Sequence, residues 1–172
     1  APVAALQTAN GIVEAPLVLV DAVWLRERVV EWVTIAVCDA CARDGIAGLL
    51  GLNVTGQFQV SIDHEQHELR LSPRRSQRGR ELDIAQWLVL RSTVRQWWDG
   101  RIEVEVTGDN RSHAPIQEAL VEVECLDGRY SGQLIGLPPN GRRTTTGARP
   151  RGSDCSEYSI RLHSGSWPRA RS

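Results

Sequence analysis

Short apolar runs that alternate with polar residues and are divided by turn signals are the feature that most limits the fold of this chain. After Asp99-Gly100, a strong hairpin turn signal, the segment "RIEVEVTG" (101–108) alternates with period two. "ALVEVECLD", "RYSGQLIGL" and "EYSIRLHSG" follow at spacings of roughly ten residues, separated by Gly, Pro and Asn. Regular short strands of this kind predict an antiparallel β-sandwich.

The N-terminal half also consists of apolar runs, which are rich in Val, Ile and Leu: "GIVEAPLVLVDAVWL", "RVVEWVTIAV", "GLLGL", "FQVSI" and "ELRLS". Their composition favours strands over helices, and only Asn53 to Phe58 is typical of a short helical or turn segment. A linker at 73–81 divides the two halves. We therefore predict two all-β domains, at residues 1–75 and 76–172.

Composition narrows the classes of partner. The 172 residues are 41% hydrophobic and 24% charged, as in ordinary globular proteins. No apolar run reaches the roughly 18 residues of a membrane span, and no signal-peptide pattern is present. A formal net charge of −1 argues against a nucleic-acid partner. We therefore interpret the arginine run "PRRSQRGR" as a solvated linker; it contains Arg74, Arg75, Arg78 and Arg80. The absence of Met indicates a processed product or a fragment.

The glycines of "GLLGLN" (48–53) do not form a phosphate loop, because the Lys-Ser/Thr of a P-loop and the spacing of a dinucleotide site are both missing. After the Leu-Leu-Gly turn come "FQVSID" (58–63) and a closing "LRL" (69–71). In this order and spacing, the stretch resembles the C-terminal part of a retropepsin-like aspartic peptidase. The resemblance implies a partial β-barrel of the acid-protease type in which Leu49, Leu50 and Gly51 support the catalytic turn.

The resemblance extends upstream, where residues 6–37 are similar to the flap hairpin of that family and the strands after it. Thr8, Ala9, Asn10 and Gly11 fall at the flap tip, and Asn-Gly tolerates the positive φ angles of a tight turn. The family reading implies that Ala9, Asn10 and Gly11 bind an extended peptide or protein substrate, and that the unit forms a homodimer. An ordinary Asn-Gly hairpin remains the alternative.

The catalytic element of that family is missing. Aspartic peptidases need two carboxylates that share a proton, each supplied by an Asp-Thr/Ser-Gly loop. None of the nine Asp residues begins such a loop, and Asp63, within "SIDHEQHE", fits a polar hairpin connection. We therefore assign no catalytic residue. We expect this chain alone to be inactive, with the catalytic Asp encoded upstream. The alternative is a non-catalytic peptide- or protein-binding module on the same scaffold.

The second half carries a looser resemblance. "VEVTGDNRSHAPIQEALVEVECLD" is similar to small Ig-like sandwiches of bacterial extracytoplasmic proteins, with Asn110 and Ser112 in a turn and Pro115 and Ile116 after it. The resemblance suggests a periplasmic or secreted location, which the residues themselves leave open. We interpret four tryptophans as core or inter-domain packing, with a carbohydrate platform as the alternative: Trp87, Trp97, Trp98 and Trp167.

The cysteines leave several pairings open. Cys38 and Cys41 form one "CDAC", half of a structural zinc set. Two unlinked thiols are our expectation there, and a disulfide or redox pair is the alternative. Cys125 and Cys155 stand on predicted strands, and a disulfide between the two sheets of the sandwich is one option.

The remaining polar motifs support no cofactor. His64 and His67, with Glu65 or Glu68, invite a metal reading, but alternation on a hairpin would scatter them over both faces. We predict no metal site. Asn53-Val-Thr and Asn110-Arg-Ser fit the glycosylation pattern, which matters only in a eukaryotic secretory route.

Overall fold

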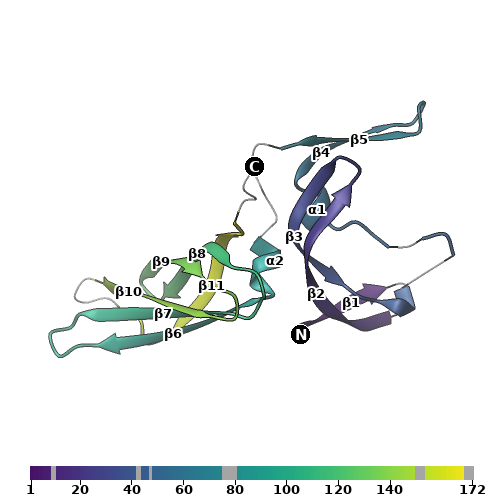
Figure 1. Ribbon diagram of the computed structural model, residues 1–172. Helices are drawn as coiled ribbons and strands as arrows, with labels where there is room; N and C mark the ends of the chain where they lie inside the picture. The colour runs from purple at the N-terminus through teal and green to yellow at the C-terminus, as the bar shows by residue number, and fades with distance from the viewer. Residues whose placement is uncertain (9–10, 42–43, 47, 75–80, 150–153, 169–172) are drawn as a thin grey trace. The chain divides into compact units, whose positions relative to one another are not determined.

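The computed structural model describes residues 1–8, 11–41, 44–46, 48–74, 81–149 and 154–168. Within them the chain is all-β, as predicted, with two short α-helices and one 3₁₀ turn (Figure 1). No helix in these ranges is both long and apolar enough to cross a bilayer. The chain forms two compact units, Ala1–Asp83 and Ile84–Ser172. Most of the predicted linker, residues 75–80, lies outside the described ranges.

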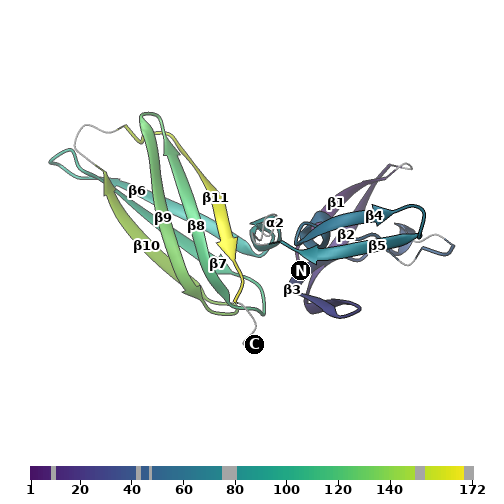
Figure 2. The same cartoon turned by 90° about the horizontal axis from the view of Figure 1, so that it is seen from above.

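The C-terminal unit is an antiparallel β-sandwich, which confirms the prediction from strand spacing. Figures 1 and 2 show its two three-stranded sheets stacked in two layers. One sheet has the order β10-β7-β6, and its strands are β6 (Leu88–Gln96), β7 (Ile102–Asn110) and β10 (Arg142–Arg149). The other has the order β11-β8-β9, and its strands are β8 (Ile116–Cys125), β9 (Gly128–Leu137) and β11 (Tyr158–Ser166).

Period-two alternation builds the core of this sandwich. Every second residue of β7 is buried, beginning at Ile102, because successive side chains of a strand point to opposite faces. Val104 and Val106 on one sheet and Val121 on the other are each 0% exposed. At Gly108 a Cβ atom would lie 2.6 Å from Leu134 Cδ1, so close packing between the sheets requires glycine there.

The tryptophans divide into two groups. Trp87 and Trp167 are buried, as predicted for core residues. Trp97 and Trp98 are not core residues, since their exposed fractions are 45% and 95%. Both lie in the β6–β7 turn, beyond the last ladder pair of Gln96 with Ile102, where the sandwich has no facing sheet to cover them.

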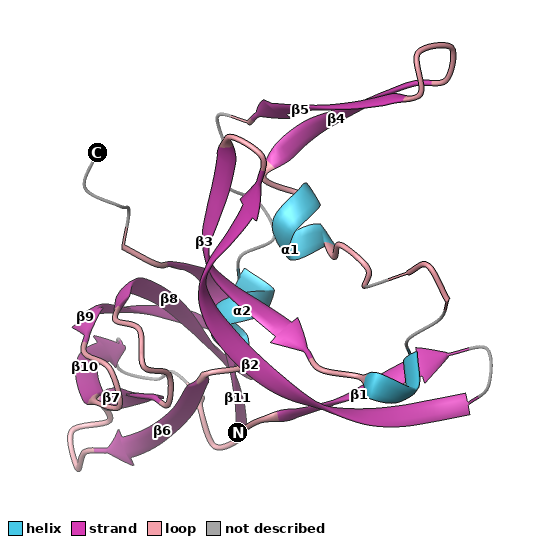
Figure 3. Cartoon of the chain, turned by 45° about the vertical axis from the view of Figure 1, so that its right-hand side comes forward, coloured by secondary structure: helices cyan, strands magenta, loops and turns pink. Residues whose placement is uncertain are grey.

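The N-terminal unit is built on one long strand, β2 (Gly11–Leu25), which Figure 3 shows crossing the unit. Its first half pairs with β1 (Val3–Thr8) and its second half with β3 (Arg28–Ala36). The neighbour changes at Pro16, whose carbonyl accepts a hydrogen bond from Val37 N at 3.0 Å. Proline is tolerated there because its missing N–H is not needed where one ladder ends.

Two further elements cover β3. The helix α1 (Leu52–Thr55) contacts β3 and β4 (Phe58–Asp63), and β4 pairs with β5 (Glu68–Pro73) in a two-stranded ribbon. A small core forms between them, consisting of Val30, Val33, Val54 and Phe58. None of the described sheets closes on itself, so the structure shows open antiparallel sheets where the sequence predicted a partial barrel.

The strand predicted for "GLLGL" (48–52) is wrong. Residues 48–51 form no strand, and Leu52 begins α1. Every described residue from 44 to 51 is exposed, and no described strand pairs with 48–51. Apolar composition alone does not make a strand when no neighbour supplies ladder hydrogen bonds. The short helix predicted within 53–58 is present as α1, shifted by one residue toward the N-terminus.

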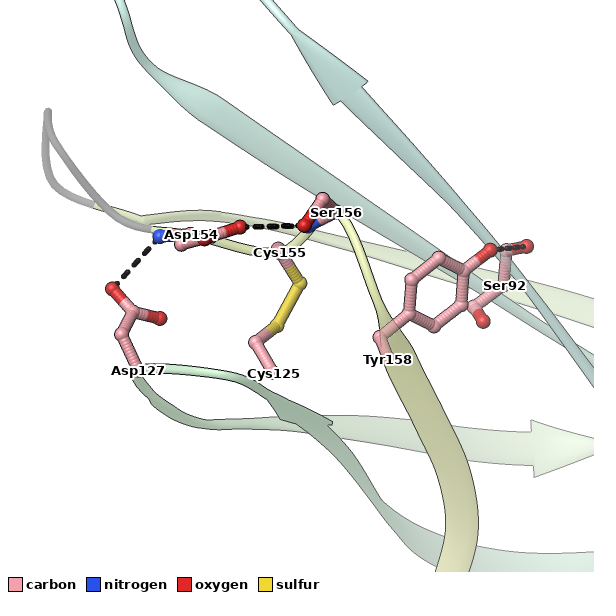
Figure 4. Close-up of a disulfide and its surroundings, with 7 residues drawn as sticks. All are labelled: Ser92, Cys125, Asp127, Asp154, Cys155, Ser156 and Tyr158. Carbon is pink, nitrogen blue, oxygen red and sulfur yellow. Dashed lines mark hydrogen bonds between the residues drawn. A yellow bond between two sulfur atoms is a disulfide. The ribbon is translucent and has the colours of Figure 1, made fainter.

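All four cysteines are paired, which corrects two expectations. Cys125 and Cys155 form a disulfide, but it joins neighbours in one sheet rather than the two sheets (Figure 4). Cys125 ends β8, and Cys155 lies just before β11, the strand that pairs with β8. Cys38 and Cys41 are also bonded, because the 3₁₀ turn η1 (Asp39–Cys41) brings their Cα atoms to 5.3 Å, within the usual range for a disulfide.

Candidate functional site

The predicted flap is the β1–β2 hairpin. Its last ladder pair joins Thr8 to Gly11, so the loop between the strands has two residues, Ala9 and Asn10, which lie outside the described ranges. Gly11 has a φ of +123°, a conformation that side chains rarely adopt. A Cβ atom there would meet nothing within 4 Å. Gly11 is therefore required by backbone conformation and not by lack of space.

The predicted supporting turn lies on the surface of this unit. Leu49 is 93% exposed and Leu50 is 56% exposed, so neither belongs to the core of the chain. Gly51 follows as the N-cap of α1, and its carbonyl accepts hydrogen bonds from Val54 N at 3.1 Å and Thr55 N at 3.0 Å. Leu49 and Leu50 are thus exposed directly before the hydrogen-bonded N-cap of α1.

The side chain of Asn53 ties this turn to the sheet. Its Nδ2 donates to Thr34 O at 2.9 Å and to Asp83 Oδ1 at 3.0 Å, and Thr34 N donates to the same Asp83 oxygen at 3.2 Å. Thr34 lies on β3, an edge strand of its sheet. The side chains of Asn53 and Asp83 therefore bind the backbone groups of Thr34 that a further strand would otherwise pair with. A Cβ atom on Gly51 would lie 2.7 Å from Asn53 Oδ1, which explains the glycine.

Asp83 is the member of this network that the sequence did not reveal. The predicted boundary placed it in the second domain, and its side chain is 3% exposed within Ala1–Asp83. No local pattern links it to Asn53, because 30 residues separate the two. The sequence motifs place Asn53 only at the end of "GLLGLN" and in a glycosylation pattern. In the structure, its side-chain amide donates two hydrogen bonds, to Thr34 O and Asp83 Oδ1.

Asp63 and the two histidines belong to the β4–β5 turn. Asp63 Oδ1 accepts hydrogen bonds from Glu65 N at 3.1 Å and Gln66 N at 3.0 Å, the arrangement of an Asx-type turn. His64 and His67 lie in the turn itself, not in alternation along strands. In the described part of the chain, no group of three or more His, Cys, Asp or Glu residues could hold a metal ion.

The Asn110 turn of the sandwich is a buried structural device. Asn110 is 2% exposed, and its Oδ1 accepts from Ser112 N at 3.0 Å and Ser112 Oγ at 2.7 Å. Its Nδ2 donates to Ala114 O at 2.8 Å and Pro138 O at 3.0 Å. These bonds hold the β7–β8 connection against the end of β9, and Ile116 begins β8 fully buried. The buried amide is not placed to accept a glycan.

The perturbed carboxyls of the sandwich take part in ion pairs and turns. Hydrogen bonding from Arg142 holds the pKa of Asp109 below its usual range, and Arg161 does the same for the pKa of Glu122. The backbone N–H of Arg101 lowers the pKa of Asp99 in the β6–β7 turn. Each of these three carboxyls lies within ion-pair distance of an arginine side chain.

No family model, curated protein or solved structure matches this chain. Function therefore has to be inferred from its own residues. Large apolar side chains are exposed on the flap hairpin, the 48–51 turn, the start of α1 and the β4–β5 ribbon, as they also are at Trp24 and at several positions of the sandwich. Those more than half exposed in the first four of these segments are Val3, Ile12, Leu49, Leu50, Leu52, Ile62 and Leu69.

Proposed function

We propose that residues 1–75 are the flap-to-C-terminal part of a retropepsin-like aspartic endopeptidase. The supporting observation is the Leu49–Gly51 turn, which leads directly into a one-turn helix whose Asn53 anchors it to β3. Before this turn comes an Asn-Gly hairpin, and after it comes the β4–β5 ribbon, whose first strand ends in Ile62-Asp63. The elements follow the order that the family motif requires.

The chemistry of such an enzyme needs carboxylates from elsewhere. One aspartate takes a proton from water, and the other, protonated, polarises the peptide carbonyl. Within the N-terminal unit, Asp63 caps a turn and Asp83 accepts two hydrogen bonds at the edge of β3. We assign neither a catalytic role. The proposed activity therefore requires an Asp-Thr/Ser-Gly segment outside these 172 residues, and a homodimer would bring two such segments together.

In this proposal the chain holds the substrate. An extended peptide would add to the flap by backbone hydrogen bonds, and alternate side chains would enter separate pockets. The positive φ of Gly11 keeps the hairpin closed by a two-residue turn. The exposed leucines of the turn would pack beneath the incoming catalytic loop, where they would lose their contact with water.

The test is peptide cleavage by the product of the complete coding sequence. We expect cleavage of unstructured peptides that disappears when the Asp of an Asp-Thr/Ser-Gly segment is changed to Asn. Gly11→Ala should lower kcat/KM by at least about tenfold through misplacement of the flap. Gly100→Ala is the matched control, since Gly100 also has a positive φ (+80°) and open space but lies in the sandwich. A complete gene with no such segment, and a product without cleavage, would refute the proposal.

A non-catalytic binding module is the second candidate, and it is favoured by the lack of any Asp-Thr/Ser-Gly segment in this chain. Strand β1 is an edge of the described sheet, so it can accept an added strand. This candidate predicts that the 172-residue chain alone binds extended peptides and leaves them intact. The endopeptidase proposal predicts that binding becomes strong only after the missing segment is supplied.

A further inference from the structure

The two disulfides of this chain sit in opposite environments. Cys125 and Cys155 are 6% and 4% exposed and lie at the end of a core strand pair, in a segment held by further bonds such as Asp154 N to Asp127 Oδ2 at 2.9 Å (Figure 4). Cys41 is exposed and Cys38 is half-buried. Exposed disulfides are the ones that thiol reagents reach and that act as labile or regulatory bonds.

The Cys38–Cys41 bond also spans little structure. The two residues are three apart, and the turn between them buries no side chain. One backbone hydrogen bond, from Cys41 N to Cys38 O at 3.1 Å, joins the same two residues as the disulfide. Opening the bond therefore leaves the sheet intact, because the ladder of β2 and β3 ends at Ala36, before Cys38.

We propose that Cys38–Cys41 is a thiol–disulfide exchange site that dithiol reductants open while Cys125–Cys155 stays closed. A reductant thiolate attacks the sulfur of Cys41, the exposed member. The S–S bond breaks, a mixed disulfide forms, and Cys38 leaves as a thiolate. The second thiol of the reductant then displaces Cys41 and becomes part of a cyclic disulfide. The protein gains two electrons and two protons and carries two thiols.

Reduction should release the loop that follows. Every described residue from 44 to 51 is exposed, and its backbone bridge lies at Ile46, so few packed contacts hold this segment in place. On its N-terminal side, this segment follows the turn that the Cys38–Cys41 disulfide closes. On its C-terminal side, it leads into α1 at Leu52. Opening the disulfide gives the exposed Leu49–Leu50 pair more freedom. This inference does not depend on peptidase activity.

The experiment is native-state reduction with dithiothreitol, a rapid alkylation quench and peptide mapping. Cleavage after arginine places the cysteines in three separate peptides, 29–43, 112–129 and 152–161. We expect alkylation of Cys38 and Cys41 at least about tenfold faster than that of Cys125 and Cys155. Equal rates, or faster labelling of the sandwich pair, would overturn the proposal.

Hydrogen exchange supplies the second readout. Residues 44–51 should exchange faster in the reduced protein than in the oxidised one, while β7 should not change. The variant C38S/C41S should match the reduced protein without any reductant. If that variant does not fold, the comparison of oxidised and reduced wild type still decides. Unchanged exchange at 44–51 after confirmed reduction of the pair would contradict the release of the loop.

Discussion

The two units use apolar residues differently. In the sandwich, the inner positions of β7 and β8 are almost completely buried, and the large apolar side chains that stay exposed, such as Trp98 and Ile135, lie in turns or on outer faces. In the N-terminal unit, a small buried cluster around Val33 and Phe58 and a few buried residues of β2 coexist with exposed leucines and isoleucines on the flap, turn and ribbon. The difference shows that the inner residues of the two sandwich sheets bury one another. The N-terminal unit leaves seven large apolar side chains of the flap hairpin, the 48–51 turn, α1 and the β4–β5 ribbon more than half exposed.

The largest expected difference between the units concerns their disulfides. C125A/C155A should lower the free energy of unfolding by about 3–4 kcal/mol, because the bond closes a long loop. C38A/C41A should lower it by less than about 2 kcal/mol, since its loop is very short. Urea denaturation of both variants measures this. Equal losses would mean that the exposed bond matters as much to the fold as the buried one.

Neighbouring residues of β9 offer a sharper contrast within the sandwich. Leu134 is 1% exposed and Ile135 is 64% exposed. Leu134→Ala should cost about 3 kcal/mol, because it removes buried methyl groups and leaves a cavity. Ile135→Ala should change stability by less than about 0.5 kcal/mol. Similar values for the two variants would show that β9 is not packed as described.

Two asparagines compare the units through hydrogen bonding. Asn110→Ala should cost about 2–3 kcal/mol, since it leaves buried carbonyl groups of Ala114 and Pro138 without this donor. Asn53→Ala should cost about 1 kcal/mol, because its site is only partly buried. Asn53→Ala should also speed hydrogen exchange at Thr34 and in the turn at 48–51. Protection that stays the same there would disprove the anchoring role of Asn53.

The smallest expected effect is a pH dependence of the sandwich. Ion pairing lowers the pKa of Asp109 and of Glu122 in the folded state. Their contribution is therefore fully present above the ordinary carboxyl pKa of about 4, and it is lost as the pH falls through the lowered values. Denaturation at pH 6 and pH 3 should show this loss, and Asp109→Asn should reduce it. A variant with an unchanged pH slope would contradict the pairing with Arg142.

Local signals predicted the strands well and the tertiary contacts poorly. The alternation in "RIEVEVTG" indicated β7 and its buried face because period two reflects strand geometry itself. The run "GLLGL" misled because burial depends on what the fold brings opposite, and here nothing described covers Leu49. The Asn53–Asp83 contact joins residues whose separation gives no periodic signal. The Cys38–Cys41 pairing followed from a 3₁₀ turn that the "CDAC" spacing did not by itself predict.

The identity of the N-terminal unit is best tested by measuring peptide cleavage with the product of the complete coding sequence. If that sequence holds an Asp-Thr/Ser-Gly loop, we expect hydrolysis of unstructured peptides, loss of hydrolysis on Asp→Asn, and burial of Leu49 and Leu50 seen as slowed hydrogen exchange in the turn. The absence of both cleavage and added protection at 48–51 in the product of the complete coding sequence would contradict the account.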